Sequence, residues 1–166
     1  MPGHFADRLM QAIREKESQV LVGLDPRFER LPEQTRNDAI SDYGETPAAA
    51  GKAFVAFNRA IIDLVADVAV AVKPQVAFYE QMGTAGMAAY AATVGYAREK
   101  GLLVIGDVKR NDISSTAAAY AAGHLAPKPD QMASSDFAAD AITINPYLGA
   151  DGIRPFMEAG ERSGAG

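Results

Sequence analysis

The sequence predicts an α/β protein with a parallel β-sheet. Four short apolar runs, over residues 20–24, 68–72, 102–105 and 141–144, are separated by segments with helical periodicity. Continuous apolar runs are typical of strands that helices cover on both faces, which is the environment of a parallel sheet. Four such units form either a small doubly wound sheet or half of a (β/α)8 barrel, and periodicity alone leaves both open.

Length and composition restrict the kind of protein. The chain has 166 residues, 48% of them hydrophobic, which predicts one globular domain with a real core. A net charge of -5 argues against a general nucleic-acid binder. The chain has no cysteine and two histidines, so a disulfide framework and a Cys-ligated zinc site are excluded. No apolar stretch approaches the roughly 20 residues of a membrane helix, and the first residues do not resemble a secretion signal. We therefore expect a cytoplasmic protein with no membrane partner.

Helical signals dominate the first half of the chain outside its strands. Phe5, Leu9 and Ile13 recur every four residues, which predicts a helix over 5–18. Thr46 followed by Pro47 is a typical N-cap and first helical residue, for a helix running to about residue 67. Between the first strand and this helix, the charged segment 27–46 predicts a long loop with room for one helical turn.

Similar signals mark the elements of the second half. Thr84 is expected to cap a third long helix that stops at Gly101, after a short helical turn within 79–83. A helix over 114–122, a loop over 127–135 and a helix led by Asp151 follow. Residues 160–166 have no periodicity and predict an irregular tail.

Charged residues follow three of the predicted strands. Asp25 ends the first strand, Lys73 the second, and Asp107 with Lys109 the third. Because parallel strands end on one side of the sheet, these side chains should converge on one rim, where α/β proteins place their active sites. Side chains alternate along a strand, so Asp107 and Lys109 face the same way if the extended backbone continues. The alternative is an exposed ion pair contributing ~0–1 kcal/mol.

Four ordered motifs carry a resemblance to a known family. Residues 107–113 read DVKRNDI, which resembles the D-x-K-x-x-D-I signature of orotidine 5′-phosphate decarboxylases. The segments VGLDP at 22–26, VKPQ at 72–75 and TINPYLG at 143–149 are similar to the longer, bacterial-type subfamily. The resemblance extends from about Leu21 to Phe156.

The resemblance implies a fold and an activity. Members of this family are TIM (β/α)8-barrel homodimers that convert orotidine 5′-phosphate to UMP and CO₂ in pyrimidine biosynthesis, with no metal and no organic cofactor. Residues 1–166 would then be the N-terminal half of a single barrel domain, comprising about its first four β/α units, with the C-terminal half absent. The family's phosphate-binding arginine near the C-terminus has no counterpart here, so we expect this chain alone to be poorly active.

The resemblance also implies roles for individual residues. Lys109 would donate the proton to C6 of the pyrimidine, and Asp107 would lie against the leaving carboxylate. Lys73 would bridge the ribose and the charged array, and Asp25 would bind a ribose hydroxyl. Three further residues would serve the pocket or the dimer: Asp112 reaching into the partner's site, and Ile113 and Thr116 lining the base and ribose pocket, Thr116 across the dimer.

Two other functions remain open at this point. One is a Mg²⁺-dependent sugar-phosphate decarboxylase or aldolase of the same superfamily, which shares the D-x-K-x-x-D core. Such enzymes hold Mg²⁺ with further carboxylates near the strand ends, whereas Ile105 and Gly106 precede Asp107 here. The other is a non-catalytic α/β assembly module, in which the charged rim has only a structural role.

Overall fold

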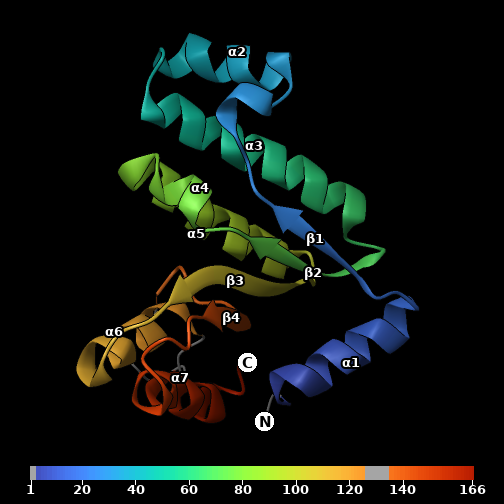
Figure 1. The fold of residues 1–166 in the computed structure, drawn as a ribbon. Coiled ribbons are helices and arrows are strands. Elements are labelled where there is room, and N and C mark those ends of the chain that lie inside the picture. Colours follow the sequence, from blue (N-terminus) through green and yellow to red (C-terminus); the bar gives the residue numbers. More distant parts are fainter. Residues whose placement is uncertain (1–2, 126–134) are drawn as a thin grey trace.

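A computed structural model describes residues 3–125 and 135–166 of the chain. Strands and helices largely alternate along it, with a 3₁₀ turn, η1, after the first strand (Figure 1). The elements are α1 (Phe5–Lys16), β1 (Val20–Leu24), η1 (Phe28–Arg30), α2 (Glu33–Tyr43), α3 (Pro47–Val65), β2 (Ala69–Pro74), α4 (Ala77–Glu80), α5 (Gly83–Glu99), β3 (Leu103–Arg110), α6 (Ser114–His124), β4 (Ala141–Ile144) and α7 (Ala150–Ser163).

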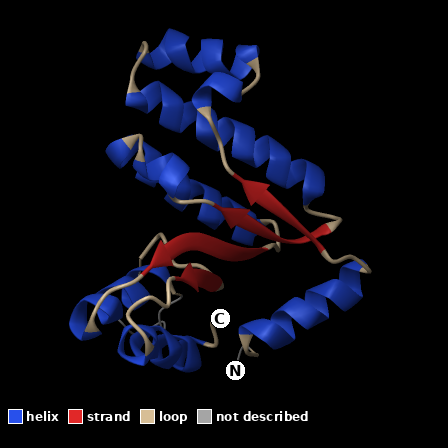
Figure 2. Ribbon diagram, viewed as in Figure 1, coloured by secondary structure: helices blue, strands red, loops and turns tan. Residues whose placement is uncertain are grey.

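The four strands form one parallel sheet in the order β1-β2-β3-β4 (Figure 2). Each strand therefore lies beside the one before it in the chain. A doubly wound sheet reverses its strand order near the middle, whereas a (β/α)8 barrel adds its strands in sequence. The order confirms the predicted α/β class and favours the barrel over the doubly wound alternative.

The main core lies between the sheet and helices α3 and α5. Phe54 and Ile62 from α3 and Tyr90 and Val94 from α5 are buried in one hydrophobic cluster that also includes Val104 of β3. A polar network crosses this core, in which Asn58 donates to the Tyr79 hydroxyl at 2.9 Å and to the Thr93 hydroxyl at 3.0 Å. The Tyr79 hydroxyl in turn donates to the Leu24 carbonyl at 3.2 Å. The network thus fixes the carboxyl end of β1, which Asp25 follows.

Helix α1 packs across the opposite end of the sheet. The Lys16 ammonium donates to the carbonyls of Ala66 and Ala69, where β2 begins. Arg8 pairs with Asp140, directly before β4. Helix α1 therefore covers the ends where strands begin and leaves the carboxyl ends free of it (Figure 1).

The structure confirms the predicted start of α3 and the predicted end of α5, but the predicted N-cap of α5 is wrong. Thr46 accepts a hydrogen bond from the Ala49 amide at the start of α3, with Pro47 in the first turn. Gly101 has the positive φ of +74° expected just past α5. Helix α5 begins at Gly83, two residues earlier than a Thr84 cap implies, so Thr84 lies inside the helix and does not cap it.

Two segments predicted to be irregular are helical. Within 27–46 the structure has η1 and the eleven-residue helix α2. Helix α2 packs on α3 and buries only one residue, Ala39. A helix with one buried residue has no apolar stripe for periodicity to detect. Helix α7 continues to Ser163, into the predicted tail, and ends at Gly164. The loop predicted over 127–135 falls, except for Ser135, outside the described residues.

A helix that crosses a membrane needs about 20 predominantly apolar residues. Across residues 3–125 and 135–166, none of the helices combines the length and apolar character needed to cross a bilayer.

Candidate active site

The carboxylate of Asp107, near the end of β3, is the centre of a polar cluster. Its Oδ2 accepts hydrogen bonds from the Lys73 ammonium at 2.9 Å and the Gln75 amide at 2.8 Å. Its Oδ1 accepts from the Lys109 ammonium at 2.6 Å and the Thr143 hydroxyl at 2.8 Å. Asp107 itself is buried, whereas Lys109 has 60% of its side chain exposed. The cluster thus joins β2, β3 and β4 at one rim, where the strand ends predict that Lys73, Asp107 and Lys109 converge.

The surroundings of Asp107 determine its ionisation. Burial alone would raise the pKa of its carboxyl, but hydrogen bonds from Lys109, Lys73 and Thr143 outweigh burial and lower the pKa to about 2. Asp107 is therefore ionised at neutral pH. Its negative charge lies between two ammonium groups, so the cluster as a whole carries one positive charge.

The backbone at Lys109 departs from a regular strand. Lys109 has φ of +46°, in the left-handed region that side-chain-bearing residues rarely adopt. The pairing of β3 with β4 shifts register between Gly106 and Arg110, which is the irregularity of a bulge. Asp107 and Lys109 do meet, as the sequence predicts, but through this bulge instead of the continued extended strand that the prediction assumed.

The contacts of Lys73 and Gln75 with Asp107 follow from where these residues lie on and just after β2. Lys73 is the fifth residue of β2, and Gln75 directly follows the strand and forms a bridge with Asp107. The backbone repeats the link, since the Val76 amide donates to the Asp107 carbonyl at 3.2 Å. Backbone pairing therefore holds Lys73 and Gln75 against the carboxylate.

The structure places the remaining predicted site residues outside this cluster. Asp25 follows β1 on the same rim and lines a separate pocket with Arg27 and Arg30. Asp112 accepts a hydrogen bond from the Ile113 amide, and no ion pair within the described part of the chain includes it. Ile113 has 65% of its surface exposed, and Thr116 is exposed as well. One chain thus brings together Lys73, Asp107 and Lys109 but does not add Asp112.

Sequence reasoning assigned no role to Gln75 or Thr143, although both contact Asp107. Each lies in a motif that carried the resemblance. Thr143 is also a polar residue inside an otherwise apolar strand, which is a signal that could have identified it. Arg110 was also given no role by the sequence. It pairs with Glu80, and its guanidinium lies 5.4 Å from the centre of the Tyr120 ring.

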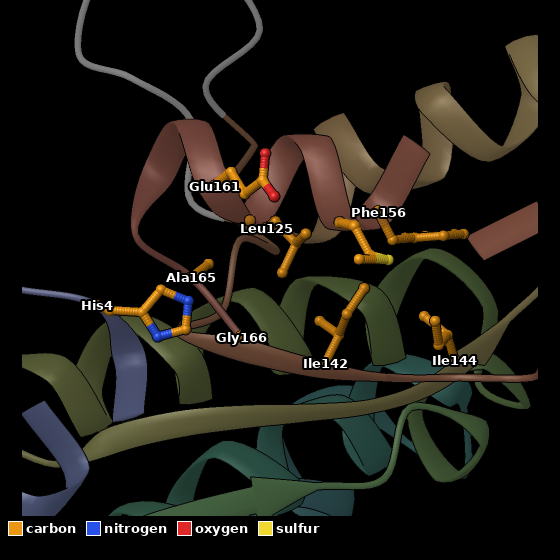
Figure 3. Close-up of a pocket in the computed structure, with 10 residues that line it drawn as sticks. His4, Leu125, Ile142, Ile144, Phe156, Glu161, Ala165 and Gly166 are labelled. Atoms are coloured by element: carbon orange, nitrogen blue, oxygen red, sulfur yellow. The ribbon is translucent and has the colours of Figure 1, made fainter. Parts of the chain in front are cut away.

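An apolar pocket of about 290 Å³ lies elsewhere, between β4 and α7 (Figure 3). Ile142 and Ile144 point into it from the strand, and Phe156 faces them from α7, with His4 and Glu161 at its edge. Its lining includes none of the residues that contact Asp107. The pocket is therefore separate from the charged rim, and its lining has no lysine and no aspartate.

The described residues hold no group of three or more His, Asp or Glu side chains arranged to bind a metal ion. The rim itself presents two ammonium groups, those of Lys73 and Lys109. An ammonium has three donor protons. Lys73 and Lys109 each give one to Asp107, so each retains protons for an anionic ligand.

Comparison with known proteins identifies the family to which the chain is similar. Residues 18–166 match the sequence model of the Orotidine 5′-phosphate decarboxylase / HUMPS family. The chain is 45% identical over 163 residues to an orotidine 5′-phosphate decarboxylase of Rhodopirellula baltica, covering 98% of this chain and 52% of the relative. A Clostridium perfringens decarboxylase is 37% identical, with 98% and 50% covered. The chain thus spans about half the length of the curated relatives it matches.

Solved structures agree with the sequence relatives. A crystal structure from Streptomyces avermitilis superposes with a TM-score of 0.77 at 34% identity, over 99% of this chain and 51% of that one. Leishmania donovani OMP decarboxylase gives a TM-score of 0.68 at 33% identity, over 93% and 49%. These neighbours are TIM barrels, and the four strands in sequence correspond to about half of one. The chain belongs to the orotidine 5′-phosphate decarboxylase family.

Proposed function

We propose that this chain carries the catalytic cluster of an orotidine 5′-phosphate decarboxylase, which forms UMP and CO₂. The observation that supports this most strongly is the contact of Lys73, Asp107 and Lys109 at one rim, with Asp107 ionised between the two lysines. A role in pyrimidine biosynthesis and a cytoplasmic location are parts of the same proposal, supported by the family resemblance.

The reaction breaks one bond and forms one. The bond between C6 of the pyrimidine and the carboxylate breaks, CO₂ leaves, and the electron pair stays on C6. The Lys109 ammonium then gives a proton to C6, and solvent returns one to the lysine. Because the ring gives the C6 carbanion little resonance stabilisation, an ammonium already held nearby is the group that this reaction needs.

The electrostatic stabilisation from one lysine is smaller than the reduction of the barrier that enzymatic catalysis can require. A unit charge 4 Å from the developing carbanion stabilises it by ~4 kcal/mol at an effective dielectric constant of 20. Enzymatic acceleration can require a reduction of the barrier by up to ~23 kcal/mol. Lys109 therefore needs help, which we assign to the fixed geometry of Lys73 and Asp107, to repulsion between Asp107 and the substrate carboxylate, and to binding of the remote phosphate.

The other residues would bind the nucleotide. We propose that Lys73 bridges the ribose and the charged cluster, that Asp25 binds a ribose hydroxyl, and that Ile113 and Thr116 line the base and ribose pocket. The position of Asp25 on the same rim as Lys73 is consistent with a shared ribose site.

The activity is tested by measuring UMP formation from orotidine 5′-phosphate. Because the chain spans about half the length of its relatives, the assay compares it alone with a chimaera that adds the C-terminal half of the Rhodopirellula baltica relative. We expect little turnover by the chain alone and efficient turnover by the chimaera. A correctly folded chimaera that neither binds UMP nor forms it would contradict the proposal and favour a non-catalytic module.

A chelation experiment separates the Mg²⁺-dependent alternative. The chimaera is assayed with excess EDTA and again with added Mg²⁺. We expect the same rate in both, since the proposed chemistry uses only side chains of the cluster. Loss of activity in EDTA and its return with Mg²⁺ would favour the sugar-phosphate enzyme.

We also propose a homodimer in which Asp112 and Thr116 serve the partner's site. The exposure of Ile113 and Thr116, and the position of Asp112 outside its own cluster, support this arrangement. It predicts complementation between two inactive chimaeras, Lys109→Ala and Asp112→Ala. Mixed dimers have one intact site, so remixing should restore roughly a quarter of wild-type activity. If the remixed dimers stay inactive, Asp112 acts within its own chain.

A further inference from the structure

The left-handed backbone of Lys109 is an unusual feature of the rim. The residue has φ of +46°, and a residue other than glycine keeps such a conformation only where its surroundings enforce it. On its C-terminal side, the Arg110 carbonyl accepts from the Asn145 amide at 2.9 Å, which ties the bulge to the end of β4. The amide of Lys109 itself needs a different partner, because the bulge removes it from the regular pairing.

That partner is the hydroxyl of Thr143 on β4. The Lys109 amide donates to Thr143 Oγ1 at 3.1 Å, and the same hydroxyl donates to Asp107 Oδ1 at 2.8 Å. Asp107 Oδ1 also accepts from the Lys109 ammonium at 2.6 Å. The three residues therefore form a closed ring of hydrogen bonds. A hydroxyl has one proton to donate and can accept, so Thr143 fulfils both functions at once.

We propose that Thr143 is a positioning residue, whose hydroxyl holds both the left-handed backbone of Lys109 and the carboxylate of Asp107. This rests on the proposed function of the two residues that it positions. One oxygen atom thereby fixes the carboxylate relative to the backbone that carries the proton-donating ammonium. The hydrogen bond from Thr143 also contributes to the lowered pKa of Asp107.

The matched variants are Thr143→Val, which removes the hydroxyl at similar shape, and Thr143→Ser, which keeps it. Both are made in the 166-residue chain and measured by NMR, with Thr35→Val as the same change at a distant position in α2. We expect Thr143→Val to raise the pKa of Asp107 and to speed exchange of the Lys109 amide roughly tenfold, as loss of one hydrogen bond would. Thr143→Ser should preserve both, and Thr35→Val should change neither.

Two results would overturn the proposal. One is a Thr143→Val chain in which the Asp107 pKa and the Lys109 amide exchange match wild type. The other is a Thr143→Ser chain that loses both, because then the methyl group and not the hydroxyl is responsible. If Thr143→Val does not fold, Thr143→Ala replaces it. If neither folds, exchange in the wild-type chain decides: a protected Lys109 amide supports the ring, and an unprotected one contradicts it.

Turnover of the chimaera separates this proposal from the proposed function. We expect Thr143→Val to lower kcat roughly 10- to 100-fold with KM little changed, and Thr143→Ser to restore it. A wild-type chimaera that forms no UMP, together with the expected NMR changes, would remove the decarboxylase assignment and leave the ring intact. An active chimaera whose kcat does not respond to Thr143→Val would overturn the positioning role alone.

Discussion

Two buried carboxylates, Asp107 and Asp140, lie at opposite ends of the sheet and have different partners. Asp107, at the carboxyl ends of the strands, binds two lysines, an amide and a hydroxyl. Asp140, directly before β4, binds Arg8 of α1 at 2.5 Å and the Val104 amide of β3 at 2.9 Å, with Arg98 of α5 at 3.8 Å. Each end therefore neutralises one buried carboxylate with two cations.

The choice of cation differs with the task. A guanidinium is planar and has several donors in a fixed fork, which suits it to joining elements. Around Asp140 the arginines tie α1 and α5 to the sheet. An ammonium is a compact charge that can transfer a proton, and Lys109 has 60% of its side chain exposed. The two sets of partners agree with our proposal, in which the carboxyl end of the sheet carries the chemistry and the amino end stabilises the fold, the division that is general in (β/α)8 barrels.

The largest expected difference between the two carboxylates is in turnover. In the chimaera, Asp107→Asn should reduce kcat roughly 10²- to 10³-fold, because it removes the charge that holds both ammonium groups in place. Asp140→Asn should leave kcat within a few-fold of wild type once folding is verified by circular dichroism. Equal losses of kcat in the two variants would break the division between the two ends.

His124 is expected to cause the largest change of stability with pH. It is therefore replaced before the acid stability due to Asp107 is measured. Its burial, followed by the charge of Arg110, lowers its pKa to about 4 from 6.5. The unfolded chain therefore takes up the proton first, so stability is full above pH 6.5 and falls as the pH drops to 4, by at most about 3 kcal/mol. Urea titrations of His124→Phe should be flat across this window. A slope equal to wild type would assign the effect to another group.

With His124 replaced, the dependence of stability on acid pH reports on Asp107. Its pKa is lowered from 3.8 to about 2, so its ionised form stabilises the fold above pH 3.8, and this contribution is lost as the pH falls through 2. In the His124→Phe background, the loss should be about 2 kcal/mol. Asp107→Asn should abolish it, and retention of the same acid slope would show that Asp107 is not the group responsible.

Asp140 should matter for stability at neutral pH. Asp140→Asn removes a charge that two arginines share and weakens the bond to the buried Val104 amide. We expect the free energy of unfolding to fall by about 2 kcal/mol, less than for a fully buried pair because both arginines are partly exposed. Chemical denaturation at pH 7 measures this. A change below about 0.5 kcal/mol would place Asp140 with ordinary surface pairs.

The sequence predicted the strands and the lysine–aspartate contacts because both follow short-range rules. Apolar runs of four or five residues indicate buried strands, and charges at the ends of parallel strands converge. Helix α2 could not be found this way, since it buries only Ala39 and is held by packing on α3. Its stability is tertiary, and no local pattern records it.

The rest of the site depends on contacts between strands. Thr143 reaches Asp107 from β4 and Gln75 reaches it from the end of β2, and these distances depend on register. The left-handed conformation of Lys109 likewise follows from the bulge between β3 and β4. Residue type and spacing identified Lys73, Asp107 and Lys109 as groups that meet, but the other contacts of Asp107 and the geometry of the cluster required the folded sheet.

Replacement of Lys109 by alanine in the chimaera tests whether this lysine is the proton donor. UMP binding and UMP formation are measured side by side, with Lys100→Ala as a control at a lysine that pairs with Asp63 away from the rim. We expect Lys109→Ala to retain the fold and nucleotide binding but to form no measurable UMP, while Lys100→Ala is unaffected. Turnover by Lys109→Ala near the wild-type rate would contradict this role.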